Sequence, residues 1–182
     1  MEGFARGLPK AELHVHVEGT LEPELLLELA SRHRVALPYR SPAEVRAGYR
    51  FTDLQSFLDL YVSNQRVLCE EDDFHRLTLG YLEHAHADGV RHAEVFFDPQ
   101  SHTARGVPFG AVLEGIATGL AEGEKRYGIS TRLIMCFLRD LGAGAAERTL
   151  DEALPYRDWI DGVGLDSAER DNPPGPYAHV FA

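Results

Sequence analysis

The segment that decides the fold lies near the amino terminus and reads Glu12-Leu13-His14-Val15-His16-Val17-Glu18. Successive side chains on a β-strand point to opposite faces, so a strand over residues 11–17 places His14 and His16 on the same side. Two imidazoles two residues apart on a strand supply half of a metal site, because nitrogen ligands suit zinc and similar transition metals. An exposed strand with two solvated histidines is the simpler alternative.

The composition is that of a globular protein and excludes several classes of function. The 182 residues carry 18 basic and 29 acidic side chains, a net charge of −11, which disfavours nucleic-acid binding through phosphates. No apolar run has the length of a signal peptide or of a membrane span, so we expect a cytoplasmic protein with no membrane partner. The two cysteines, Cys69 and Cys136, are expected to be free thiols.

Strand and helix patterns alternate along the chain. Strands are expected at residues 11–17, 91–97, 129–138 and 160–165. Helices are expected at 23–34, 42–48, 72–88, 109–127 and 144–154, with a further helix that begins at a capping box of Thr52 and Gln55. Residues 98–106 are predicted to form a loop. Such alternation indicates parallel strands joined by crossover helices.

Four parallel strands fit either an open doubly wound sheet or half of an eight-stranded barrel, and periodicity does not distinguish them. The polar residues of the first strand favour the half-barrel. In a regular strand Glu12 and Glu18 share the side of the two histidines. Four polar residues in line are costly to bury in a sheet that helices cover on both faces. In a barrel they line the interior, with the metal at the carboxyl end of the strands.

Residues 8–20, Leu-Pro-Lys-Ala-Glu-Leu-His-Val-His-Val-Glu-Gly-Thr, resemble the amino-terminal signature of the adenosine and adenine deaminase family, within the metal-dependent amidohydrolase superfamily. Residues 51–58 resemble the inserted helices of that family. Residues 94–106 and 162–169 look like its adenine deaminase branch. The resemblance covers nearly the whole chain.

The resemblance implies an α/β fold built as a (β/α)₈ barrel of the TIM type, which needs about 250 residues or more. Residues 1–182 would then be a partial deaminase barrel domain: its amino-terminal half, with about four β/α units plus inserted helices, truncated before the later strands. The catalytic Glu that acts as general acid and the remaining metal ligands are expected beyond Ala182, so no catalytic residue is assigned within this chain. The missing carboxyl-terminal half of the barrel is the expected partner.

The resemblance also implies the chemistry, which is hydrolytic removal of the 6-amino group of a purine. His14 and His16 match the first two ligands of one Zn²⁺ per complete site. The zinc lowers the pKa of a water molecule, and the resulting hydroxide replaces the amino group. With adenine as the small-molecule substrate, the products are hypoxanthine and ammonia, a reaction of purine salvage.

Three residues are candidates for substrate contact. Glu18 stands where adenosine deaminases carry an Asp that contacts the ribose, and Glu169 stands where they carry a Gly, so both favour the free base. Asp166 lies in the same segment as Glu169. A turn-stabilising role for Glu18 and a solvated loop over residues 166–169 are the simpler alternatives.

Other polar residues are interpreted more simply. Asp98 ends the second strand and could face the site, but a turn residue before Pro99 is the commoner role. The remaining histidines, including His102, are interpreted as ordinary surface or partly buried residues. Arg132 and Arg139 could pair with acidic groups inside the barrel.

Two alternatives to an adenine deaminase stay open. The first keeps the enzyme class but has adenosine or another 6-aminopurine as the substrate. A chain of these 182 residues could also be a truncated, non-catalytic product, because two histidines alone hold zinc weakly and catalytic zinc sites have three or more protein ligands.

Overall fold

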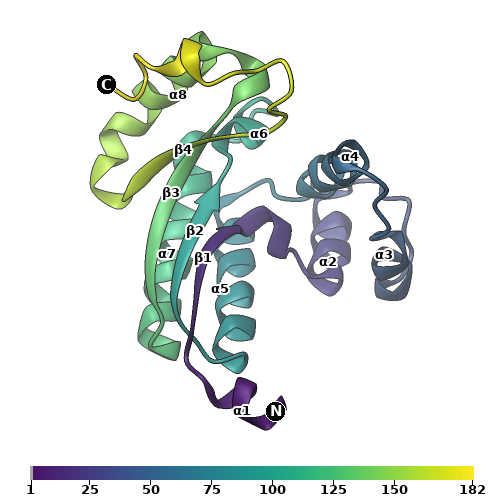
Figure 1. Ribbon diagram of the computed structural model, residues 1–182. Coiled ribbons are helices and arrows are strands. Elements are labelled where there is room, and N and C mark those ends of the chain that lie inside the picture. Colours follow the sequence, from purple (N-terminus) through teal and green to yellow (C-terminus); the bar gives the residue numbers. More distant parts are fainter. Residues whose placement is uncertain (1) are drawn as a thin grey trace.

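The computed structural model describes residues 2–182, shown as a ribbon in Figure 1. The strands are β1 (Lys10–His16), β2 (Val90–Phe97), β3 (Ser130–Leu138) and β4 (Gly162–Asp166). The helices are α1 (Glu2–Gly7), α2 (Pro23–His33), α3 (Pro42–Gly48), α4 (Leu54–Gln65), α5 (Glu71–Ala87), α6 (Pro99–Thr103), α7 (Phe109–Tyr127) and α8 (Ala143–Ala153).

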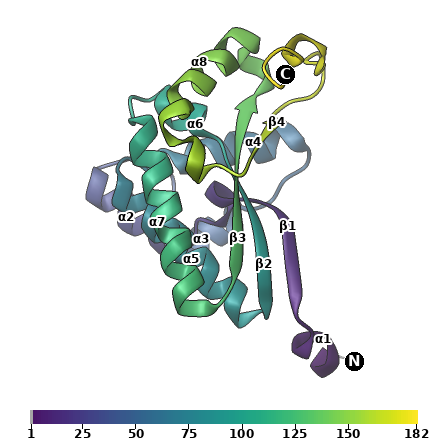
Figure 2. The same cartoon turned by 90° about the vertical axis from the view of Figure 1, so that its left-hand side faces the viewer.

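The four strands form one parallel sheet in the order β1-β2-β3-β4. Helices α5 and α7 lie along one face of this sheet, and no helix runs along the opposite face of its lower part (Figure 2). A doubly wound sheet reverses its strand order and carries helices on both faces, so the sequential order excludes it. The molecule is the half-barrel that the sequence predicts.

Strand β1 is irregular. Its pairing with β2 shifts between Glu12 and Val15, which indicates a bulge. On one side of the bulge, Glu12 accepts a 2.8 Å hydrogen bond from the hydroxyl of Tyr81 on α5, so it faces the helix layer. On the other side Val15 packs against the core, while Leu13 is 58% exposed. The prediction that Glu12 shares the histidines' side, with Leu13 on the apolar face, is therefore wrong.

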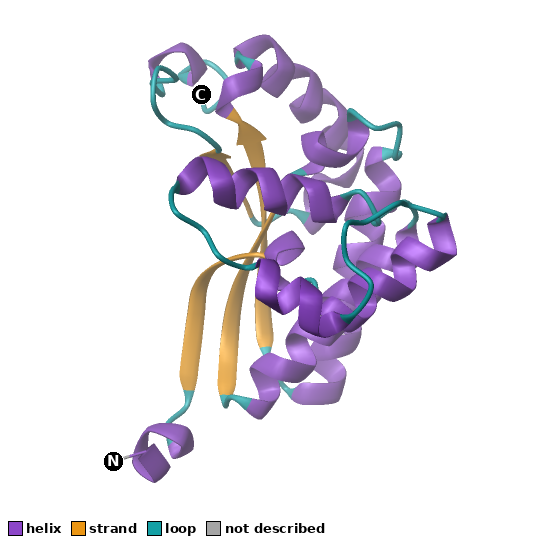
Figure 3. Cartoon of the chain, turned by 90° about the vertical axis from the view of Figure 1, so that its right-hand side faces the viewer, coloured by secondary structure: helices purple, strands orange, loops and turns teal. Residues whose placement is uncertain are grey.

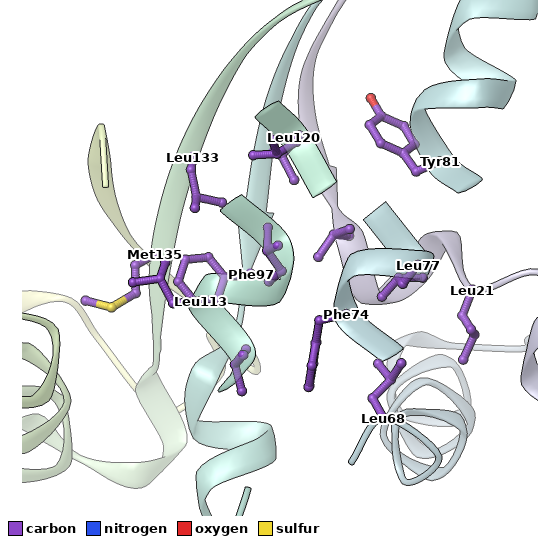
Figure 4. Close-up of a cluster of buried hydrophobic side chains, with 14 of the residues drawn as sticks. Leu21, Leu68, Phe74, Leu77, Tyr81, Phe97, Leu113, Leu120, Leu133 and Met135 are labelled. Carbon is purple, nitrogen blue, oxygen red and sulfur yellow. The ribbon is translucent and has the colours of Figure 1, made fainter. Parts of the chain in front are cut away.

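The hydrophobic core lies between the sheet and helices α5 and α7, and Figure 4 shows part of it. Phe97 from β2 and Leu113 from α7 are fully buried there, as are Phe74 and Leu77 from α5. Each such side chain contributes about 1.5–3 kcal/mol to folding by leaving water. This layer fixes the outer face of the sheet and leaves the carboxyl ends of the strands free for a site.

Helices α2, α3 and α4 form a separate group that follows β1 and lies beside its carboxyl end (Figures 1 and 3). Helix α4 begins with a capping box in which Asp53 accepts from the backbone of Ser56 and Ser56 accepts from the backbone of Asp53. The prediction of a box between Thr52 and Gln55 is wrong by one residue. Asp is as good an N-cap as Thr, and a serine three residues on can take the returning bond.

Two short helices differ from the sequence-based prediction. Residues 98–106 were predicted as loop, but α6 begins at Pro99, a residue suited to the first helical turn. Helix α1 precedes the sheet and was not predicted. Within residues 2–182 no helix is both long and apolar enough to cross a bilayer.

Helices α5 and α7 approach each other closely along glycines. The α7 residues at this contact recur every four positions: Gly115, Gly119 and Gly123. A Cβ added at Gly115 would collide with the backbone carbonyl of Glu71, and one at Gly123 would collide with Leu82. Backbone cannot move aside as a flexible side chain can, so the approach depends most on Gly115.

We therefore expect Gly115→Ala to lower the free energy of unfolding by about 1–3 kcal/mol through overpacking. Urea unfolding followed by circular dichroism measures it. Gly144→Ala in α8 is the matched control, because its added methyl meets only the tip of the Arg148 side chain at 3.7 Å. That variant should be neutral or slightly stabilising. Equal stability of the two variants would contradict the packing described here.

Candidate metal and substrate site

A cavity of about 840 Å³ opens at the carboxyl ends of the strands. Its floor comes from β1 and the residues that follow β2, β3 and β4, and its wall is helix α4. The polar side chains among its lining residues are His14, His16, Thr20, Gln55, Asp59, Tyr61, Ser63, Arg66, Asp98, Ser101, Asp140, Asp166 and Ser167. Binding sites of barrels lie at this end of the strands.

His14 and His16 lie together on the cavity floor. Their ring centroids are 5.4 Å apart, and both rings contact Phe96 of β2, at 4.4 Å for His14 and 5.4 Å for His16. The register shift falls between Glu12 and Val15, so His14 lies within the irregular stretch, yet its ring and that of His16 both line the cavity. The structure therefore brings the two predicted ligands side by side, as the strand spacing predicts.

Asp98 is a second polar residue of the floor and is only 2% exposed. One of its oxygens, Oδ1, lies 3.4 Å from Nδ1 of His16, and the other, Oδ2, accepts a 3.1 Å hydrogen bond from the Tyr61 hydroxyl. Nδ1 of His16 also lies 3.6 Å from Asp166 Oδ2. The interpretation of Asp98 as a turn residue missed this contact with His16.

Glu18 lies behind the floor with its side chain fully buried. Its Oε1 accepts a 2.9 Å hydrogen bond from the backbone N–H of Asp98 and lies 3.2 Å from Nε2 of His102. Arg105 lies on the far side of the His102 ring, with Nη2 2.8 Å from Nδ1. Because a guanidinium only donates, Nδ1 accepts and Nε2 carries the proton that is donated to Glu18.

His102 is thus a fully buried donor and not the ordinary surface or partly buried histidine of the sequence-based interpretation. Tyr61 is the other residue that the sequence analysis did not single out. Its hydroxyl lies within reach of two carboxylates, those of Glu18 and Asp98. The sequence contains one signal for the role of His102, which is its spacing of three residues from Arg105. At helical spacing two such side chains are neighbours, and α6 brings them into contact.

His16, Asp98 and Asp166 on the cavity floor shift one another's pKa. Burial raises the pKa of Asp166 to about 9, and hydrogen bonding to Asp98 and the charge of Glu18 add to the shift. Burial, the largest single effect, opposes the ionised form of Asp98 as well. The hydrogen bond and charge of His16, together with hydrogen bonds from Asp166 and Tyr61, outweigh it and place the pKa of Asp98 below its usual range. Burial alone would lower the pKa of His16, but the nearby Asp98 carboxylate raises it. Without a cation, Asp166 therefore holds a proton at neutral pH.

The three predicted substrate residues have different places. Asp166 lines the cavity. The Glu18 carboxylate lies behind the floor and is occupied by internal donors, which fits the alternative of a residue that stabilises the following turn. Glu169 points away and its 81% exposed side chain pairs with Arg139 at 3.2 Å. Arg139 also donates to the backbone carbonyl of Leu165, so it holds this loop.

The residues of the floor fit a metal ion. His16, Asp98 and Asp166 form a group whose ligand atoms lie within 4.8 Å of one another. Three buried polar atoms there have no hydrogen-bond partner within residues 2–182, namely His16 Nδ1, Asp98 Oδ1 and Asp166 Oδ1. Buried polar atoms are nearly always paired, so three unpaired donors and acceptors at one place are the chemistry expected of a cation-binding site. Imidazole and carboxylate donors suit zinc.

In a second group of possible ligands, Asp73 lies in the first turn of α5, Cys69 lies just before that helix, and His33 lies at the end of α2. It has an explanation without a metal. Asp73 Oδ2 accepts from the backbone N–H groups of Cys69 and Glu70 and lies 2.8 Å from His33 Nε2. This carboxylate is therefore satisfied as a helix cap. Both cysteines are free, as predicted.

The family model for adenosine deaminase matches residues 9–182. The chain belongs to the adenosine deaminase family. It is 60% identical over 177 residues to a protein of Cupriavidus necator named adenine deaminase, covering 97% of this chain and 50% of that relative.

Two solved structures share the fold. The crystal structure of adenine deaminase from Arthrobacter aurescens is 51% identical, with a TM-score of 0.91 over 95% of this chain and 53% of the other. An amidohydrolase from Burkholderia ambifaria with bound zinc is 30% identical, with a TM-score of 0.88 over 98% of this chain and 50% of the other. The chain thus spans about half the length of these relatives, which confirms the half-barrel.

Protonation of Asp166 gives a testable pH dependence. In metal-free protein we expect the free energy of unfolding to fall as the pH rises from about 5 to 9. The folded state keeps the Asp166 proton in this range, whereas the unfolded chain, with an ordinary pKa of 3.8, has lost it. Rising pH therefore favours unfolding, by up to ~1.4 kcal/mol per pH unit. The raised pKa of His16 acts in the same direction.

Urea unfolding at several pH values, with a chelator present, measures this dependence. Asp166→Asn removes the titrating group and should flatten the profile between pH 5 and 9. An unchanged slope in Asp166→Asn would contradict the assignment of the proton to Asp166.

Proposed function

We propose that residues 1–182 are the amino-terminal part of a single barrel domain of a zinc-dependent adenine deaminase, located in the cytoplasm. The observation that carries the proposal is the pair of rings, His14 and His16, held 5.4 Å apart on the floor of a cavity at the carboxyl ends of the strands. The proposed reaction is the hydrolysis of adenine to hypoxanthine and ammonia. The adenine deaminase names of relatives at 52–60% identity support this substrate.

In this proposal His14 and His16 would hold the zinc ion, together with ligands from the part of the relatives that this chain does not span. When bound, zinc supplies a water molecule whose pKa is low enough to give hydroxide near neutral pH. The zinc-bound relative from B. ambifaria supports the choice of metal. The general-acid Glu would come from outside residues 1–182, as would any further catalytic group.

The chain's own residues would shape the purine site. The cavity wall formed by α4 includes the apolar side chains of Leu54, Phe57 and Val62, and a flat ring can pack against them. Asp166 lies on the floor beside the histidines and would contact the reacting end of the site. Adenosine remains the alternative substrate, because the cavity is open and about 840 Å³ in volume.

The test is an assay of the whole protein that carries these residues, with adenine and adenosine offered side by side. We expect ammonia release from adenine at a kcat/KM at least ~100-fold above that for adenosine. His14→Ala and His16→Ala should each lower turnover by more than ~100-fold, beyond the range for residues that only support a ligand. Turnover of adenosine with adenine left intact would refute the substrate.

A chain of residues 1–182 alone gives a separate prediction. We expect it to release no ammonia from adenine, even with added zinc, because two histidines do not make a catalytic zinc site. The same ammonia assay measures it, and circular dichroism reports whether the chain has folded. Clear turnover by the folded half-barrel would show that its own carboxylates complete the site.

A further inference from the structure

We propose that Asp98 is a positioning residue, which holds the His16 ring with Nδ1 toward its own carboxylate and leaves Nε2 for the metal ion. The inference rests on the proposed function, since it concerns the metal site of that function. It assigns to Asp98 a part in metal binding that does not require the carboxylate to touch the ion.

The first support is the isolation of two atoms. Nδ1 of His16 and Oδ1 of Asp98 are 3.4 Å apart, both are shielded from solvent, and neither has a hydrogen-bond partner within residues 2–182. Each is thus available to satisfy the other, and the distance is one that closes by a small rotation of the ring. A ring nitrogen that faces a carboxylate carries the hydrogen, so the other nitrogen keeps its lone pair.

The second support is the exposure of the ring. The His16 side chain is 26% exposed and lines the cavity, yet Nδ1 itself is buried. The exposed part of the ring therefore consists of its other atoms, on the cavity side. His14 lines the same cavity. A shared ion would be bound by His16 from that side.

A competing arrangement puts the ion between His16 Nδ1, Asp98 and Asp166, whose ligand atoms lie within 4.8 Å of one another. His14 is not part of that group, so this arrangement leaves one of the two neighbouring rings unused. It also makes Asp98 a direct ligand. The two arrangements therefore differ in what they require from the carboxylate of Asp98.

The third support is that Asp98 is itself held in place. Its backbone N–H donates to Glu18, and Oδ2 accepts from Tyr61, which leaves Oδ1 alone to face His16. A carboxylate behind a metal-binding histidine fixes the tautomer and the orientation of the ring. Its loss commonly lowers metal affinity about 10–100-fold.

The experiment measures the zinc affinity of the whole protein by competition with a chelator. Asp98→Ala should weaken zinc binding about 10–100-fold. Asp98→Asn should stay within about 10-fold of the unaltered protein, because the amide oxygen can accept from His16 Nδ1 and the NH₂ group can donate to the Tyr61 oxygen. A direct ligand behaves differently, since an amide replaces a zinc-binding carboxylate poorly and Asn would then lose as much as Ala.

Glu94→Gln is the matched control, because it removes a carboxylate from β2, the strand that Asp98 follows, where the Glu94 side chain is 36% exposed and lies 3.9 Å from His92. It should leave the zinc affinity unchanged. Equal losses in Asp98→Ala and Asp98→Asn, or no loss in Asp98→Ala, would overturn the inference. If Asp98→Ala does not fold, Asp98→Asn decides alone, and a loss above 10-fold overturns it. Failure of the unaltered protein to bind zinc would instead refute the proposed function.

Discussion

The buried carboxylate of Glu18 joins three parts of the chain that meet at the site. It lies in the turn after β1 and accepts hydrogen bonds from the backbone N–H of Asp98, where β2 ends, and from His102 of α6. Its other oxygen lies 3.4 Å from the hydroxyl of Tyr61 in α4. A buried charge is costly unless donors surround it, and here the backbone N–H of Asp98 and Nε2 of His102 both donate to it. The floor and the wall of the cavity are therefore tied to one side chain, and the positions of His16 and Asp98 depend on it.

The apolar core and the polar site lie in different parts of the molecule. Helices α5 and α7 cover the outer face of the sheet and supply the apolar burial. The carboxyl ends of the strands carry instead a dense group of acids and imidazoles that would repel or remain unpaired in isolation. The apolar core and the polar site thus occupy different layers of the molecule.

Much of the fold could be predicted from the sequence because its signals are local. The apolar stripe and the closing Gly128 gave the bounds of α7, Phe109–Tyr127, without error, and Pro42 and Gly48 did the same for α3. His14 and His16 were placed on one side by strand alternation. Glu12 was misplaced by the same rule, since a bulge changes the alternation and leaves no local mark in the residues that form it.

The rest of the site depends on contacts between distant positions. Glu18 and His102 are 84 residues apart in the sequence, and Glu18 and the backbone of Asp98 are 80 apart. The sequence around Asp98 does not distinguish this residue from the many aspartates that precede a proline in a turn. Only when the strands are adjacent does the acid at the end of β2 meet the histidine at the end of β1.

The bulge in β1 also bears on how the two rings are held. It divides the strand into a lower part, anchored to the helix layer through Glu12 and Tyr81, and an upper part that begins at Val15 and carries His16. His14 lies in the irregular stretch between them. Leu13 and His14 have no partner in the register with β2, whereas His16 pairs with Phe96. The place of the His14 ring therefore depends less on the hydrogen bonds of the sheet than the place of the His16 ring does.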